Sequence, residues 1–356
     1  MTWNISNVNP VADSLAPRYG VSLATIGLFT TALFLTHLAA QVPGGKAADR
    51  FGARRIGFVA VACAVTGNVI CLLTPNAGVA LAGRAIVGLG TGAGFVAGVE
   101  YMRATNPSPF LQGLYGGSTM GGGGLAIAIV PQLESCLGWR ASYWTALAIA
   151  LGVGLVLAVA PADAPRHTGL RRTLVVDRRL VALGCLHAAT FGLSVVAASW
   201  AVELLTHHGH GKRWSAVAGA LFLLAGIVTR PLGGYVARRR PDRVRVSVAA
   251  ALAMGAAATL ALALPLPFAV LVLAALTAGL AAGFPLAAVF SRAQRERPEA
   301  PAAAIGFVNG VAAVVIVVGV PVAGLSFSLP GEGRIGFAVI AALWASALAA
   351  VPAADL

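Results

Sequence analysis

An arginine interrupts the apolar stretch "GIVTRPLGGYVARRR", which covers residues 226–240. Arg230 comes eight residues before the basic cluster that begins at Arg238. A guanidinium presents a planar fork of N–H donors, and this fork matches a carboxylate or a similar oxyanion. Arg230 could therefore hold an anion inside the apolar segment. It could instead extend its side chain to water, since eight helical residues span only about 12 Å.

A second arginine and several neutral polar residues also lie in apolar segments. Arg84 is the second embedded charge, and it could bind a solute or serve the structure alone. Histidine titrates near neutral pH, so His37 and His187 are the candidates for proton coupling, although a hydrogen-bonded interior histidine would give the same sequence pattern. The residues that could add hydrogen bonds to a solute are Gln41, Asn309, Ser118 and Thr119.

No aspartate or glutamate lies in the middle of an apolar segment. Placing an arginine at the centre of a membrane helix costs roughly 2.5–3.5 kcal/mol on insertion scales, so its charge needs compensation. The simplest source of a negative charge is the substrate. The sequence therefore favours a small anion as the solute.

The composition requires that these residues be placed in a membrane. Of the 356 residues, 58% are hydrophobic and only 10% are charged, with a mean hydropathy of +0.84, whereas globular proteins carry about 25% charged residues. The apolar segments are continuous, as membrane helices require, and do not alternate as in a barrel. We predict an all-α integral membrane protein.

We predict eleven complete membrane-spanning helices and one partial helix before them. The first sixteen residues would reach only about 24 Å as a helix, which is short of a full span. Either the chain starts upstream or its first helix is shortened. The predicted ranges are 3–16 for the partial helix and then 22–44, 56–74, 79–103, 111–132, 141–159, 180–204, 215–236, 246–264, 268–291, 303–326 and 335–351.

The net charge of +13 reports orientation in the membrane. If alternate loops share a side, one side holds 18 of the 25 lysines and arginines and the other holds five. Under the positive-inside rule, the 18-charge side is cytoplasmic. We expect a multi-pass protein of the plasma (inner) membrane, with basic loops and linker in the cytoplasm and no nucleic-acid partner.

The sequence contains no signal for an enzyme, a cofactor or a metal. Four scattered cysteines form neither a disulfide framework nor a metal-binding spacing. The run "GLGTGAG", residues 88–94, lies inside an apolar helix, where small residues permit close helix packing instead of binding phosphate. Glycines in "GGSTMGGGG", residues 116–124, would similarly offer a smooth face to another helix.

The chain divides into two halves of six helices. The loop "APADAPRHTGLRRTLVVDRR" is the longest connection between predicted helices. We therefore predict an N-terminal bundle at 1–160, a linker at 161–179 and a C-terminal bundle at 180–356. Repeated halves are typical of secondary transporters, which bind solute between the halves near mid-membrane.

Three motifs carry a family resemblance. "GGKAADRFGARR", residues 44–55, resembles the loop between helices two and three of the major facilitator superfamily. "RAIVGLGTGAG", residues 84–94, is similar to the fourth-helix motif of that family, and "GWRASYW", residues 138–144, to the start of its sixth helix. The resemblance implies two six-helix bundles related by pseudo-symmetry. In the second half, "GGYVARRRPDR" has Arg238 where the family motif has aspartate.

The first motif also predicts a conformational latch. Its acidic and basic residues lie where a helix meets the cytoplasm, and a glycine there permits a tight turn. In such a fold Glu100 would lie within reach, so we expect ion pairs that break when the halves move. The alternative is that these charges only set orientation. The predicted latch residues are Gly45, Asp49, Arg50, Gly52, Arg54 and Glu100.

Two subfamily resemblances bear on the solute. "RPLGG" after Thr229, the glycine-rich fifth helix with Pro131, and "GWR" resemble the nitrate/nitrite porters, which pair this arginine with a second one. Aligning Gly45 with Gly234 puts Gln41 opposite Arg230, so the second arginine is absent. Residues 283–310 are similar to cyanate-permease-like members. A single arginine suits a monoanion, either inorganic or a carboxylate.

Two other functions stay open at this point. One is efflux of a neutral or amphipathic metabolite, although the fifth helix lacks the G-P-x-x-G-G signature of drug/proton antiporters. The other is a sensor or an inactive homologue that transports nothing. For a transporter we expect a monomer in the lipid bilayer, a small-molecule substrate and a proton as the candidate coupling ion.

Overall fold

The computed structural model describes residues 1–8, 11–163 and 176–356. Over these residues the secondary structure is helical, and ten helical stretches are long and apolar enough to cross a membrane. One stretch, Pro109–Val159, joins two helices through a short turn. Counting those two separately gives the eleven full-length helices that the sequence predicts.

The helices vary greatly in length, and several are joined by a single turn. One turn of π-helix, Ala188–Gly192, joins α8 to α9, and one turn of 3-10 helix, Gly138–Arg140, joins α6 to α7. The α-helices are α1 (Thr2–Ser6), α2 (Ala12–Tyr19), α3 (Leu23–Phe51), α4 (Ala53–Leu73), α5 (Ala77–Thr105), α6 (Pro109–Leu137), α7 (Ala141–Val159), α8 (Arg178–His187), α9 (Leu193–His207), α10 (Lys212–Arg239), α11 (Val244–Leu262), α12 (Phe268–Gly283), α13 (Leu286–Glu296), α14 (Pro301–Leu325), α15 (Arg334–Ser346) and α16 (Val351–Ala354).

The first motif forms a helix and one tight turn, where the sequence predicted a loop. Helix α3 continues past Gly44 to Phe51, so Asp49 and Arg50 lie on its last turns. It ends at Gly52, whose φ of +92° is readily adopted only by glycine. Helix α4 begins at the next residue. The glycines before Asp49 stay helical because they lie against other helices.

Other predicted helices are interrupted. The partial helix predicted at 3–16 is two short helices, α1 and α2. Asn7 follows α1 and commits its side-chain amide to the carbonyl oxygen of Ser142, at 2.8 Å. The helix predicted at 268–291 divides at Phe284 and Pro285, where proline lacks the N–H that a continuous helix needs. The helices predicted at 180–204 and 335–351 are divided by the π-helical turn and by a 3-10 turn.

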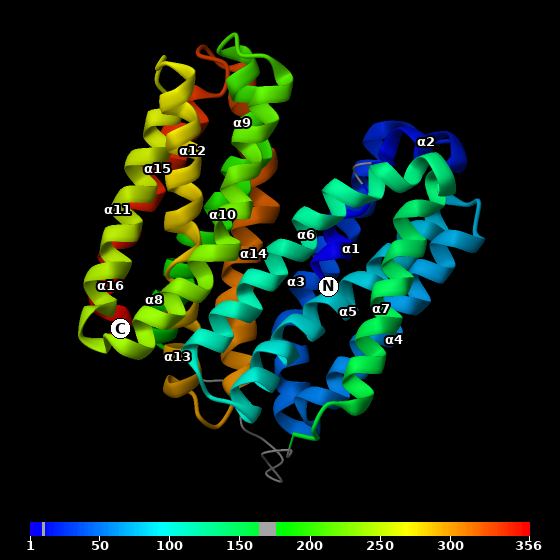
Figure 1. Cartoon of the computed structure of the whole chain (residues 1–356), viewed down its shortest axis with the longest axis horizontal. Helices are drawn as coiled ribbons and strands as arrows, with labels where there is room; N and C mark the ends of the chain where they lie inside the picture. The colour runs from blue at the N-terminus through cyan, green and yellow to red at the C-terminus, as the bar shows by residue number, and fades with distance from the viewer. Residues whose placement is uncertain (9–10, 164–175) are drawn as a thin grey trace. The chain divides into compact units, whose positions relative to one another are not determined.

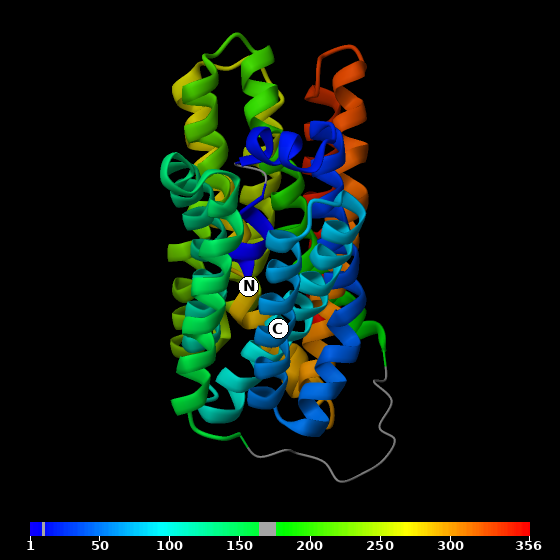
Figure 2. The same ribbon diagram turned by 90° about the vertical axis from the view of Figure 1, so that its right-hand side faces the viewer.

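The chain forms two compact units. Unit 1 contains Met1–Asn106, Gly121–Leu174 and Pro298–Gly306, and unit 2 contains Pro107–Met120, Val175–Arg297 and Phe307–Leu356. In unit 1, α5 packs between α3 and α4 (Figures 1 and 2). In unit 2, α10 contacts α9 and α12, and α11 contacts α12 and α15. Helices α6 and α14 each contribute one part to each unit.

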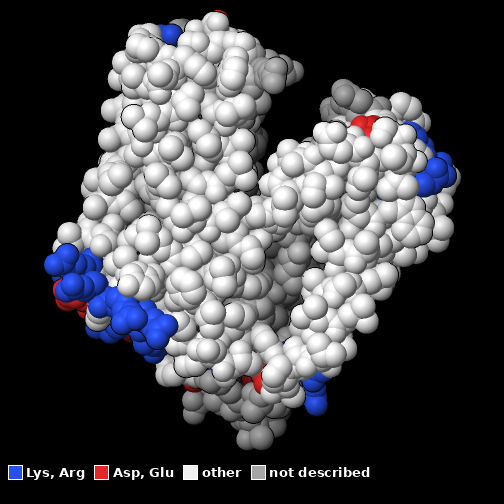
Figure 3. All heavy atoms as spheres, in the orientation of Figure 1, with Lys and Arg blue, Asp and Glu red and all other residues white. Residues whose placement is uncertain are grey.

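The sides of the helices suit lipid. Large apolar side chains such as Leu155 and Val159 are mostly exposed, at 72% and 86%. On the face drawn in Figure 3, lysine and arginine side chains gather at the ends of the helices and leave the long sides uncharged. This pattern confirms the multi-pass membrane architecture that the composition predicts.

Glycine brings pairs of helices into backbone contact within each unit. In unit 2, a Cβ on Gly113 of α6 would lie 2.2 Å from the carbonyl oxygen of Arg230, and one on Gly234 would lie 2.3 Å from that of Pro109. In unit 1, a Cβ on Gly306 of α14 would lie 2.3 Å from the carbonyl oxygen of Gln41. The α6–α10 and α3–α14 contacts therefore allow no side chain at these positions.

We predict that Gly113→Ala destabilises the protein by about 1–3 kcal/mol, the usual cost of overpacking, because its methyl group would collide with backbone. Thermal unfolding of the purified protein would measure this. The matched control is Gly152→Ala in α7, where an added Cβ meets nothing within 4 Å; it should be neutral or stabilising by up to about 1 kcal/mol. Equal melting temperatures for the two variants would contradict the close approach of α6 and α10.

Candidate functional site

Arg230 is buried in unit 2, with 3% of its surface exposed. Its Nη1 donates to the carbonyl oxygen of Gly116, at 2.8 Å, and to Oγ1 of Thr119, at 3.2 Å. Its Cζ lies 5.1 Å from the ring centre of Phe191, a cation–π distance. Its Nε has no hydrogen-bond partner in the described part of the chain. The side chain is therefore held inside the bundle and does not extend to water.

The hydroxyl pair in α6 is divided between two faces. Thr119 is buried, donates to the carbonyl oxygen of Gly116 at 2.6 Å and accepts from Arg230. Ser118 is exposed and donates to the carbonyl oxygen of Tyr115. Successive residues on an α-helix point about 100° apart, so only one of the two can face Arg230. Of the two hydroxyls, Thr119 is the one that contacts Arg230.

His187 is hydrogen-bonded to Asn309 and lies against Phe191, the ring that Arg230 also contacts. Nε2 of His187 lies 3.1 Å from Oδ1 of Asn309. The imidazole stacks on Phe191, with 5.3 Å between ring centres, and also contacts Phe290. A π-helical turn follows His187 and contains Phe191, and such turns are frequent at functional sites. Phe191 was missed in the sequence, where its spacing of four residues from His187 was the available signal.

His37 and Gln41 form a closed chain of hydrogen bonds in unit 1. The Nε2 amide of Gln41 lies 2.7 Å from Nε2 of His37, and Nδ1 of His37 lies 3.0 Å from Oγ1 of Thr91. Because an amide nitrogen only donates, the imidazole accepts at Nε2 and donates at Nδ1. Thr91 donates onward to the carbonyl oxygen of Gly88. Both ring nitrogens of His37 are thus occupied.

Arg84 lies in unit 1 and is fully buried. Its Nη2 donates to the backbone carbonyl oxygen of Asn4, at 2.6 Å. The side chain of Asn4 accepts from Asn68, at 2.7 Å. This arrangement fixes α1 against α4 and α5, while Nε and Nη1 of Arg84 have no hydrogen-bond partner among the described residues. Contact between Arg84 and a solute stays a prediction.

Within the described residues, Asp49, Glu100, Arg50 and Arg54 of the predicted latch contact helix ends and neighbouring side chains. Both carboxylate oxygens of Asp49 accept backbone N–H groups at the start of α14, from Ala302 and Ala303, each at 3.0 Å. Glu100 pairs with Arg103, whose Nε is 2.7 Å from it. Arg50 is exposed and lies over the ring of Phe51. A carboxylate at a helix N-terminus is favourable because it meets unsatisfied N–H groups and the positive end of the dipole.

Arg54 takes part in a similar contact at another helix end. It donates to the carbonyl oxygens of Leu157 and Ala158 in the last turn of α7, at 2.8 and 2.7 Å. Asp163 accepts the backbone N–H groups of Ala53 and Arg54, at the start of α4. Asp163 was not among the predicted residues, because it lies in the linker and outside any motif. Most of that linker, residues 164–175, lies outside the described residues.

Unit 2 has no aspartate at the position that aligns with Asp49 of unit 1. Arg238, which aligns with Asp49, is exposed. Instead, Gln112 near the start of α6 donates to Oε1 of Gln294, at 2.6 Å, and accepts from Ser291, at 2.9 Å. These three buried side chains join α6 to α13 without any charge.

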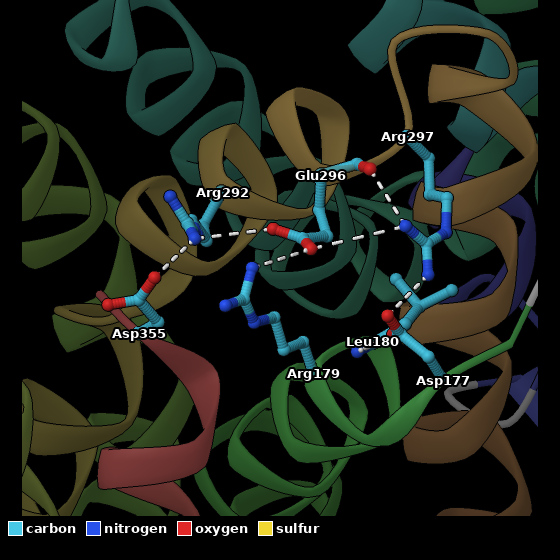
Figure 4. A network of polar contacts seen from close by, with 7 residues as sticks. All are labelled: Asp177, Arg179, Leu180, Arg292, Glu296, Arg297 and Asp355. Carbon is cyan, nitrogen blue, oxygen red and sulfur yellow. Dashed lines mark hydrogen bonds and ion pairs between the residues drawn. The ribbon is translucent and has the colours of Figure 1, made fainter.

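An ion-pair network closes one end of unit 2 (Figure 4). Arg292 of α13 pairs with Asp355 beyond α16, at 2.7 Å, and with Glu296, at 3.2 Å. Arg179 of α8 also pairs with Glu296, at 3.2 Å. Arg297 contacts Asp177, at 2.7 Å, and Asp177 caps α8 by accepting the N–H of Leu180. The network ties the ends of three helices together.

The sequence profile of the Major Facilitator Superfamily matches residues 1–323. The probable sulfoacetate transporter SauU of Cupriavidus necator is 24% identical over 267 residues, 65% of this chain and 60% of that protein. The multidrug transporter mfsC of Aspergillus fumigatus is 30% identical over 160 residues, 44% of this chain and 31% of that protein. The chain thus spans less than two thirds of the length of these relatives.

Among solved structures, the Escherichia coli fucose:proton symporter FucP superposes with a TM-score of 0.79. The alignment covers 99% of this chain and 96% of FucP at 15% identity. At this identity the likeness shows the fold alone. It confirms the predicted all-α architecture.

We predict that Asp49→Asn destabilises the protein by about 0.5–2 kcal/mol, because the amide keeps one acceptor oxygen but loses the charge at the start of α14. Thermal unfolding would measure the loss. Glu203→Gln removes an exposed carboxylate and should change stability by less than about 0.5 kcal/mol. A melting temperature of Asp49→Asn equal to that of the unmodified protein would argue against the cap.

The N–H of Leu180, and then Arg297, hold the pKa of Asp177 below its usual range. A depressed pKa stabilises the fold above the unfolded value of about 3.9, and this contribution is lost as pH falls through the folded pKa. We therefore expect Asp177→Asn to melt below the unmodified protein at pH 7, and the difference to shrink as the pH falls below the unfolded pKa. Asp242→Asn, at an exposed pair of 3.9 Å, serves as the control. If the difference in melting temperature between the unmodified protein and Asp177→Asn grew as the pH fell, this prediction would be wrong.

Proposed function

The chain belongs to the Major Facilitator Superfamily, a family of transporters and not of enzymes, and on this premise we propose that it carries a small anion by alternating access. Arg230 is the proposed anchor, with Thr119 orienting it and Asn309 and His187 on the neighbouring wall. We place the protein in the plasma (inner) membrane as a monomer, with its basic loops in the cytoplasm. The halves 1–160 and 180–356 are the proposed moving bodies.

The observation that carries this proposal is a buried guanidinium without a carboxylate. Arg230 is 3% exposed and forms no ion pair within the described residues. One of its nitrogens is occupied by Gly116 and Thr119, and Nε is left for another acceptor. A buried charge of this kind is costly, and an anionic solute would offset the cost when it binds.

The similarity to a probable sulfoacetate transporter supports an organic anion as the solute. Proton coupling is a further part of the proposal, and His37 and His187 are its candidates, since FucP is a fucose:proton symporter. Gln41 would act through His37, to which it is hydrogen-bonded. We also propose a latch that acts through helix ends, with Asp49 released from α14 when the halves move. Its residues are Gly45, Asp49, Arg50, Gly52, Arg54 and Glu100.

A second candidate function is the export of an amphipathic compound. It is favoured by the 30% identity to a multidrug transporter over 160 residues. Such a solute would not need Arg230. The two functions therefore predict different effects of the same substitution.

The test is thermal stability of the purified protein against nitrate, nitrite, cyanate, formate, lactate and larger carboxylates. An anion present at about 100 times its Kd should stabilise the protein by about 2.7 kcal/mol. We expect Arg230→Gln to abolish this shift, because the amide has no positive charge. Arg230→Lys keeps the charge but loses the fork of donors, so we expect a weakened shift.

Two controls guard the interpretation. Arg84→Gln removes the other embedded arginine and should leave the relative effects of the anions unchanged if Arg230 is the anchor. Export of the fluorescent compound ethidium from vesicles would be measured beside binding. No shift with any anion, together with ethidium export that survives Arg230→Gln, would replace the anion proposal with the second candidate.

A further inference from the structure

The imidazole of His187 is fixed on three sides and free at one atom. It is 1% exposed, stacks on Phe191 and contacts Phe290. Its Nε2 is hydrogen-bonded to Asn309, while Nδ1 is buried without a partner among the described residues. A buried polar atom left unsatisfied costs about 1–3 kcal/mol, so Nδ1 calls for an explanation.

The hydrogen bond to Asn309 decides what Nδ1 can do. A carbonyl oxygen only accepts, so Nε2 carries the proton, and Nδ1 of the neutral ring presents a lone pair. It can therefore accept a hydrogen bond but not donate one. His37 differs, because its two nitrogens are both engaged, by Gln41 and Thr91.

Arg230 and His187 both lie against the ring of Phe191, so a positive charge is near the lone pair of Nδ1. Its Cζ lies 5.1 Å from the centre of the Phe191 ring, and the His187 ring centre lies 5.3 Å from the same point. Cζ and the imidazole centre are thus no further apart than these two distances combined. A solute that contacts both groups must fit within this span, so its carbon skeleton is short.

We propose that the solute is a short hydroxy-substituted organic monoanion, with its anionic group on the Nε edge of Arg230 and its hydroxyl donating to Nδ1 of His187. This inference rests on the proposed function. An inorganic anion such as nitrate has no donor for Nδ1. An ammonium group in place of the hydroxyl would be repelled by Arg230. The anionic group itself is a carboxylate or a sulfonate, which share the oxygens that the guanidinium recognises.

The test compares pairs of ligands that differ only in the hydroxyl. Binding to the unmodified protein would be measured by calorimetry for glycolate against acetate, lactate against propionate, and 2-hydroxyethanesulfonate against ethanesulfonate. We expect the hydroxylated member to bind about tenfold more tightly or better, because its absence leaves Nδ1 unpaired. 2-Methoxypropionate, which lacks the donor, should bind no better than propionate. These measurements need no variant.

Two substitutions at one position then locate the contact. In His187→Gln the amide reaches the place of Nε2, and in His187→Asn it reaches the place of Nδ1. His187→Gln should lose the preference for lactate over propionate. His187→Asn should keep part of that preference. Arg230→Gln should weaken both ligands.

The outcomes separate this inference from the proposed function. Equal binding of lactate and propionate by the unmodified protein would overturn the hydroxyl contact and leave the anion site standing. A preference for lactate that survives His187→Gln would also overturn it. If no anion in the panel binds, the proposed function itself fails. Comparison of the carboxylate and sulfonate pairs would identify the anionic group.

Discussion

The hydrogen bond from Arg230 to the carbonyl oxygen of Gly116 holds a permanent charge inside an apolar bundle. It requires α6 to lie close to α10, and that approach requires glycine at position 113, where a side chain would meet backbone. The same contact leaves Nε of the guanidinium without a partner. Packing, charge and the candidate site in unit 2 therefore share one constraint, which is that two helix backbones touch.

In unit 1, charged side chains form hydrogen bonds with the ends of helices. Helix ends expose N–H and C=O groups that lipid cannot satisfy. Asp49 covers the start of α14, Asp163 the start of α4, and Arg54 the end of α7. The charged motif thus consists of side chains that complete helices. In unit 2, two glutamines and a serine join α6 to α13, and these hydrogen bonds do not depend on carboxylate ionisation.

Much of the architecture could be predicted from hydropathy alone. Helix α7 begins and ends where predicted, and Arg230 lies within a helix as its apolar run indicates. The sequence left open whether its side chain is buried or extends to water. The full length of α3 could not be predicted, because its glycines stay helical through contacts with distant segments. The partner of Asp49 depends on tertiary structure in the same way. Ser118 and Thr119 are equivalent in sequence, and only the rotation of α6 separates them. Phe191 was missed because its spacing of four residues from His187 is a weak signal in an apolar helix.

The cap on α14 also constrains how the protein is made. Asp49 and its partner Ala302 are 253 positions apart in the chain, yet both belong to unit 1. A ribosome adds about 5–20 residues per second, so Asp49 waits roughly 10–50 s before its partner is synthesised. During that interval the carboxylate is available to water, lipid head groups or a membrane chaperone. Unit 1 therefore reaches its final form only after residues 302 and 303 have been synthesised.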